Sequence, residues 1–151
     1  VEKTTTNAIN TLAWGAMKNI PVVKGLSKPL VLPLHVCPEI HGVSGLDGAK
    51  FPETDQKPIE NNAIVEIYNT IKQHESKVTI IITGCATNIA ALLTVFPDIK
   101  EKIEKIIILG GAIGLGNITA AAEFNILIDP HATSIIFESG CEIYLIPIDV
   151  T

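Results

Sequence analysis

Residues 77–111, KVTIIITGCATNIAALLTVFPDIKEKIEKIIILGG, hold two apolar runs with a helical pattern between them. The runs, 77–84 and 105–111, do not alternate polar with apolar residues, so each predicts a strand that is buried on both faces of a sheet. Residues 87–97 predict a helix, because a threonine or an asparagine could cap its start and a proline ends its pattern. Strand, helix and strand in this order predict two parallel strands joined by a right-handed crossover.

The same alternation continues along the chain. Helical spacing of apolar residues occurs at 62–74, and 129–139 begins with Asp-Pro, which is a strong signal for a helix start. An apolar run at 141–149 predicts a third strand. Residues 59–151 therefore predict an α/β fold, an open and mostly parallel sheet with flanking helices of Rossmann-like type. Ligands of such sheets bind beyond the carboxyl ends of the strands.

The N-terminal part shows weaker patterns. Residues 4–18 predict a helix with threonine or asparagine as its cap, and 20–25 predict a short strand that ends in a glycine turn. Residues 26–58 hold most of the prolines and several glycines and show no periodicity. We expect a long irregular segment there, and long loops in compact domains are often lids or binding loops.

Composition excludes several classes of partner. The formal net charge is −5 and no stripe of lysine or arginine is present, which argues against a nucleic-acid partner. The longest apolar run, 106–115, is interrupted by glycines and is too short to span a membrane. The cysteines at 37, 85 and 141 form no CxxC pair, which favours a reducing compartment over a disulfide framework or a zinc site. The chain begins at Val1 and stops directly after an apolar run, so we expect both ends to be cut from something longer.

A run of glycines, GGAIGLG at 110–116, resembles a dinucleotide-binding loop only superficially. The GxGxxG spacing requires a glycine at position 119, which is Thr119, and no phosphate loop ending in GK[ST] is present.

Three polar residues follow this run within nine positions: Asn117, Glu123 and Asn125. Asn and Glu are costly to bury unless they find partners. One interpretation is a solvated loop with a residue that caps a helix. The other is a sugar or polyol site, because amides and a carboxylate match vicinal hydroxyls.

Two other segments carry polar groups in suggestive places. Residues 40–52 set His41, Ser44 and Asp47 among glycines, which suits either a solvated loop or a mobile lid with an acid-base histidine. Thr87 stands at a strand end, where it is a helix cap or one oxygen ligand of a calcium site. Calcium takes about 6 to 8 oxygens, and this chain has no clustered aspartate motif.

Together these motifs resemble the inosine–uridine type of nucleoside hydrolase, a family that cleaves ribonucleosides to ribose and a free base. The resembling segments, in the order of the family, are TTTNA (4–8), IPVVKG with KPL (20–30), HGVSGLDG (41–48), TGCATNIA (83–90), IIILGGAIGLGNITAAAEFNILIDPHA (106–132) and IDVT (148–151).

The resemblance assigns a role to each candidate residue. Asn117, Glu123 and Asn125 are expected to bind the ribose hydroxyls. Leu109, where relatives have methionine, is expected to keep an apolar contact with the ribose. Thr87 is expected to give its backbone carbonyl to a calcium ion, and His41 to lie on a mobile loop over the base.

The resemblance also implies what this chain lacks. Residues 1–151 are expected to form a single partial nucleoside hydrolase domain, without the N-terminal metal-binding strand, whose aspartates ligate calcium, and without the C-terminal part, which carries a His-Asp pair. The parent protein is expected to hydrolyse ribonucleosides for salvage as a cytoplasmic homodimer or homotetramer, and this chain alone is expected to be inactive. The alternatives are a truncated, non-catalytic product that binds ribose or a full-length subunit, and an unrelated parallel α/β binding module.

Overall fold

The computed structural model describes residues 1–17 and 19–151, and these form two compact units. The N-terminal unit comprises Val1–Ser27 and His35–Ala63. The sheet unit comprises Lys28–Leu34 and Ile64–Thr151. No helix in the described part of the chain is long and apolar enough to cross a membrane.

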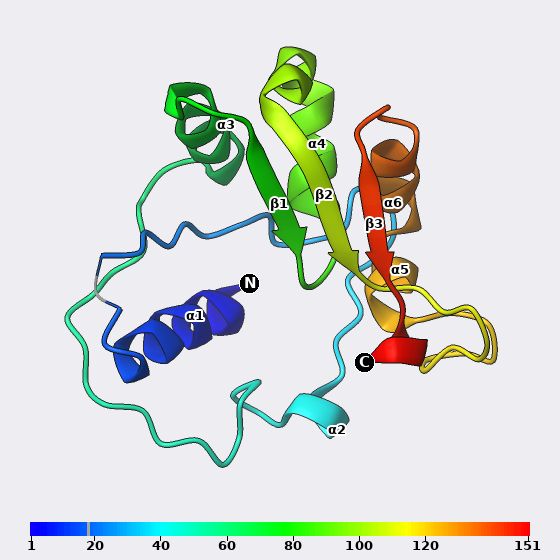
Figure 1. Ribbon diagram of the computed structural model, residues 1–151. Coiled ribbons are helices and arrows are strands. Elements are labelled where there is room, and N and C mark those ends of the chain that lie inside the picture. The colour runs from blue at the N-terminus through cyan, green and yellow to red at the C-terminus, as the bar shows by residue number, and fades with distance from the viewer. Residues whose placement is uncertain (18) are drawn as a thin grey trace. The chain divides into compact units, whose positions relative to one another are not determined.

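A three-stranded sheet is the centre of the sheet unit (Figure 1). Its strands are β1 (Val78–Ile82), β2 (Ile103–Leu109) and β3 (Ile143–Ile146), and they lie in the order β1-β2-β3. Both pairs are parallel. The predicted α/β fold with an open parallel sheet is confirmed.

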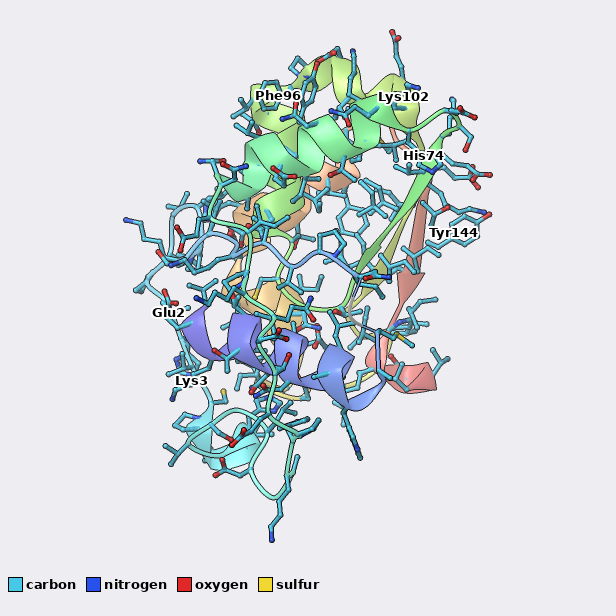
Figure 2. All side chains as sticks on the ribbon, turned by 90° about the vertical axis from the view of Figure 1, so that its left-hand side faces the viewer. Glu2, Lys3, His74, Phe96, Lys102 and Tyr144 are labelled. Carbon is cyan, nitrogen blue, oxygen red and sulfur yellow. The ribbon has the colours of Figure 1, made fainter. Side chains whose placement is uncertain are left out.

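Helices connect these strands and pack against the sheet. The elements are α3 (Ala63–Gln73), α4 (Thr87–Val95), the 3-10 helix η1 (Pro97–Lys102), α5 (Phe124–Ile128), α6 (Pro130–Phe137) and the 3-10 helix η2 (Ile148–Val150). Helices α4 and α6 lie side by side behind β2 and β3 in the view of Figure 1. At the amino-terminal side of β2, the Lys102 ammonium donates to the His74 carbonyl at 2.7 Å and thereby links η1 to the end of α3 (Figure 2).

The core lies on one face of the sheet only. Ile106 and Ile108 are buried with side chains from α3, α4 and α6, whereas Ile107 between them is half-buried. In β1, Ile81 is 66% exposed. The expectation that the strands are buried on both faces is therefore wrong for the described residues. Isoleucine is common in any strand, so an unbroken apolar run does not show how many faces are covered.

The N-terminal unit contains α1 (Glu2–Trp14) and the four-residue helix α2 (Pro38–His41) within an otherwise irregular chain. The helix predicted over 4–18 starts earlier and ends at Trp14, and it has no side-chain cap at Val1. Its last predicted residue, Lys18, lies outside the described residues.

The strand predicted over 20–25 is wrong. The structure has a single parallel bridge between Val23 and Ile59, and the Ile59 N–H donates to the Val22 carbonyl at 2.7 Å. Pro21 and Pro58 flank this bridge, and because proline has no N–H to donate, they limit further pairing. The irregular segment predicted over 26–58 is confirmed apart from α2.

Candidate sugar-binding site

The carboxyl ends of the three parallel strands lie at one edge of the sheet. Strands β1, β2 and β3 end at Ile82, Leu109 and Ile146, and each is followed by a loop that carries polar residues. This is the edge where parallel α/β sheets bind ligands. The loop after β2 and helix α5 lie together there (Figure 1).

The loop after β2 folds back tightly on itself before α5. The N–H groups of Asn117, Ile118 and Thr119 all point to the Ala122 carbonyl, at 3.1 to 3.4 Å. A Cβ atom at Gly116 would lie 2.2 Å from that same carbonyl oxygen, so only glycine fits. The chain turns back over residues 117–122, so that Asn117 at the start of the turn lies close to Glu123 at its end.

The three polar candidates are all anchored around this loop. The Phe124 N–H donates to Oδ1 of Asn117 at 2.9 Å, and the Gly111 N–H donates to Oε2 of Glu123 at 3.0 Å. Nδ2 of Asn125 donates to the carbonyl of Leu109, the last residue of β2, at 3.0 Å. Local backbone contacts therefore fix each side chain at the carboxyl end of β2.

Glu123 also serves as the N-cap of α5, because its Oε2 accepts from the Ile126 N–H at 3.3 Å. Glu123 as a residue is only 7% exposed. These contacts leave one polar atom of each side chain without a hydrogen bond to any described residue. The three atoms are Nδ2 of Asn117, Oε1 of Glu123 and Oδ1 of Asn125. These atoms offer one donor group and two acceptors for a hydroxylated ligand.

Thr87 lies at the same edge, in the first turn of α4, but it does not cap that helix. The N-cap is Ala86, and no side-chain cap is formed. The Thr87 hydroxyl instead donates to Oδ2 of Asp129 at 2.7 Å. The cap predicted at Thr87 is thus wrong, because a buried carboxylate takes its hydroxyl.

A charge effect connects the loops after β1 and β2. Burial, followed by the negative charge of Asp129 and that of Glu123, raises the pKa of the Cys85 thiol. Both carboxylates therefore act on the start of the β1–α4 loop. The Asp-Pro pair predicts the helix start at Asp129, which caps α6 by accepting from the Ala132 N–H at 3.1 Å, but it gives no sign of the contact with Thr87.

A metal centre is not formed by the described residues alone. Among them no group of three or more His, Cys, Asp or Glu side chains could hold an ion. Calcium usually needs several carboxylates, and the resemblance assigns it only one oxygen from this chain, the carbonyl of Thr87. The donor set present does not fit a complete calcium site.

His41 belongs to the N-terminal unit, where it is the exposed last residue of α2. The loop that follows is built around Asp47, whose carboxylate accepts from the Val43 N–H and the Ser44 N–H, each at 2.9 Å. Gly42 has φ +75°, and a Cβ there would collide with the Asp47 carboxylate. The glycines and the aspartate of HGVSGLDG thus fold this loop.

Comparison with known proteins places the whole chain in one family. The family model described as "Inosine-uridine preferring nucleoside hydrolase" matches residues 1–151. The chain belongs to this nucleoside hydrolase family. This match confirms the family resemblance stated from the sequence.

Among curated relatives, the pyrimidine-specific ribonucleoside hydrolases RihA of Escherichia coli O1:K1 / APEC and Salmonella agona are each 43% identical over 150 residues. The alignments cover 99% of this chain and 48% of each relative, so the chain spans about half their length.

Solved structures agree with this placement. The plant nucleoside hydrolase PpNRh1 matches with a TM-score of 0.90 and 34% identity, over 98% of this chain and 48% of that one. The purine-preferring ribonucleoside hydrolase from Gardnerella vaginalis matches with a TM-score of 0.90 and 33% identity, over the same shares.

Proposed function

We propose that this chain supplies the ribose-binding part of a ribonucleoside hydrolase, which breaks the N-glycosidic bond between ribose and base. The observation that carries the proposal is the cluster of Asn117, Glu123 and Asn125 at the carboxyl end of β2. Each side chain uses one atom to anchor itself to local backbone and keeps another for a ligand. Family membership supports the same reading of the cluster.

The proposed role of the cluster is to stabilise the positive charge that develops on the ribose in the transition state. Loss of a base from a nucleoside passes through a transition state with oxocarbenium character, in which the ribose ring becomes positive. A carboxylate and two amide groups that hold the ribose hydroxyls rigidly favour this charge, because they need not reorganise during the reaction. Leu109 is proposed to contact the apolar side of the ribose.

Other parts of the activity are proposed to need residues beyond these 151. We propose that calcium binds in the complete protein, where the Thr87 carbonyl joins aspartates that this chain does not contain. His41 is proposed to contact the base. We further propose that residues 1–151 form a single partial nucleoside hydrolase domain. We propose that the complete protein is a cytoplasmic homo-oligomer without a nucleic-acid or membrane partner.

A second candidate is a truncated product without catalytic activity that binds ribose or a full-length subunit. It is the alternative given by the sequence, and the absence of a metal-binding cluster among the described residues fits both candidates. Sequencing the source transcript across both ends of the chain separates the two candidates. An open frame that continues into an aspartate cluster upstream supports the enzyme, whereas a start and a stop at these ends support the truncated product.

Ribose release tests the proposal directly. We expect the complete gene product to release ribose from uridine or inosine and to lose this activity when calcium is chelated. We expect the purified 151-residue chain to release none, and calcium-dependent release by that chain would overturn the expectation.

A pair of variants tests the proposed cluster. Glu123→Gln keeps the shape of the side chain but removes its charge, so kcat/KM of the complete product should fall about 100-fold. The matched control is Asp98→Asn, which changes an exposed carboxylate on η1 that pairs with Lys72 at 2.9 Å. Equal activity in Glu123→Gln and the control would reject the assigned role of Glu123.

A further inference from the structure

The carboxylate of Asp149 accepts hydrogen bonds from the loop that leads from β2 to the cluster of Asn117, Glu123 and Asn125. Its Oδ2 accepts from the Ile113 N–H at 2.7 Å, and its Oδ1 accepts from the Gly114 N–H at 3.0 Å. Two successive backbone donors thus meet the two oxygens of one side chain. These bonds, first that of Ile113 and then that of Gly114, lower the pKa of Asp149.

The same loop is held on its other side by the cluster. The Gly111 N–H donates to Glu123, and the Gly111 carbonyl accepts from the Ile148 N–H at 3.0 Å. The segment 111–114 therefore lies between Glu123 and the end of β3, and Figure 1 shows it running beside η2. Hydrogen bonds thus hold the two ends of this short segment, to Glu123 at Gly111 and to Asp149 at Ile113 and Gly114.

Apolar packing does little to fix this segment. Ile113 is 84% exposed and Leu115 is 77% exposed, so their side chains bury almost no area. The loop must hold its shape mainly through hydrogen bonds, and bonds to a charged acceptor are the stronger kind. A Cβ at Gly114 would lie 3.1 Å from Oδ1 of Asp149, a tight contact that the carboxylate could relieve only by shifting a few tenths of an ångström.

We propose that Asp149 is a positioning residue for the ribose site. It holds the segment 111–114, which in turn fixes the Glu123 carboxylate through the Gly111 N–H and sets the start of the turn that carries Asn117. Asp149 touches no substrate in this role. The inference rests on the proposed function, since it assigns Asp149 to the ribose cluster.

The test uses the complete gene product in four forms: wild type, Asp149→Asn, Asp149→Ala and the control Asp98→Asn. Asparagine keeps one acceptor oxygen and turns an N–H group toward the other loop donor, whereas alanine keeps neither. Amide hydrogen exchange at Ile113 and Gly114 should therefore speed up in the order wild type, Asn, Ala. The kinetic constant kcat/KM for uridine or inosine should fall in the same order, by about tenfold or more for alanine. Asp98→Asn should change neither.

Each outcome decides the matter. Parallel loss of amide protection and of kcat/KM supports the positioning role. Lost protection with unchanged kcat/KM, or unchanged protection in both variants, overturns it while the proposed function stands. If Asp149→Ala does not fold, the Asp149→Asn variant carries the comparison alone. A wild-type product that neither binds nor hydrolyses ribonucleosides overturns the proposed function and this inference together.

Discussion

The hydroxyl of Thr87 donates a 2.7 Å hydrogen bond to Oδ2 of Asp129, a carboxylate that is fully buried. The same oxygen accepts from the Leu30 N–H at 2.9 Å, and the other oxygen caps α6 through Ala132. One side chain thus joins the segment Lys28–Leu34, the first turn of α4 and the first turn of α6. A buried carboxylate is tolerated in a protein only when donors surround it in this way.

Loss of this carboxylate should destabilise the protein strongly. Asp129→Asn turns an N–H group toward at least one of the three donors and leaves it without an acceptor. We expect the free energy of unfolding to fall by about 2 to 3 kcal/mol, as measured by urea unfolding.

A graded pair at Thr87 separates the hydrogen bond from packing. Thr87→Val keeps the shape but removes the hydroxyl and should cost about 1 to 2 kcal/mol, whereas Thr87→Ser keeps the hydroxyl and should cost less. In the double variant Asp129→Asn with Thr87→Val, the two losses of unfolding free energy should not add, because both substitutions break the same hydrogen bond. Additive losses would mean that this contact contributes little to stability.

The tight turn before α5 should tolerate no side chain at Gly116. A Cβ there meets backbone atoms of Ala122 at 2.2 to 2.4 Å, and backbone cannot move aside as a flexible side chain can. Gly116→Ala should cost about 1 to 3 kcal/mol and should weaken ribose binding by the complete gene product, because the turn sets Asn117 beside Glu123. Calorimetric titration with ribose measures the second effect.

Gly84 provides the matched control at the same edge of the sheet. An added Cβ at Gly84 meets nothing within 4 Å, so Gly84→Ala should change stability by no more than about 0.5 kcal/mol. A similar loss in both variants would show that the turn around Gly116 can relax.

The sequence predicted the sheet unit well, because its signals are local. Unbroken apolar runs predicted β1 and β2, and the Asp-Pro pair at 129 and 130 predicted the start and the cap of α6. The order of strands and helices then left a parallel sheet as the simplest topology. The site at the carboxyl edge followed from that topology together with the polar residues after β2.

The sequence did not predict hydrogen bonds between residues that lie far apart along the chain. Helix α5 has five residues, too few to show a periodicity. From the sequence, a helix cap is one interpretation for the three polar residues, without an indication of which one, and the structure shows that it is Glu123, which accepts from the Ile126 N–H. The bond from Thr87 to Asp129 spans 42 positions, and that from Ile113 to Asp149 spans 36. No local pattern encodes such pairs.

The one-sided core predicts which isoleucines matter most for stability. Ile106 in β2 is completely buried, so Ile106→Ala should lower the free energy of unfolding by about 3 to 4 kcal/mol through lost burial and a new cavity. Val95, at the end of α4, is 60% exposed, and Val95→Ala should cost less than about 0.5 kcal/mol. Urea unfolding of both variants gives the comparison, and equal losses would contradict the placement of the core.

Two aspartates that hold loops should make stability depend on pH in acid. Backbone donors lower the pKa of Asp149, and the hydroxyl of Ser44 together with backbone N–H groups lowers the pKa of Asp47. Because the native state binds fewer protons at these groups than the unfolded state, a fall in pH favours unfolding. The stabilisation is fully present above the unfolded value of about 3.8 and is lost as the pH falls through the lowered native pKa of each group.

Asn variants at these positions provide the measurement. Asp149→Asn and Asp47→Asn should each have a lower melting temperature than the wild type at pH 6, and the difference should shrink as the pH is lowered toward 3. Below about 3.8 the unfolded state takes up protons at these groups before the native state does, so the charged hydrogen bonds contribute progressively less to stability. A difference in melting temperature that stays constant between pH 6 and pH 3 would mean that neither charge contributes to holding its loop.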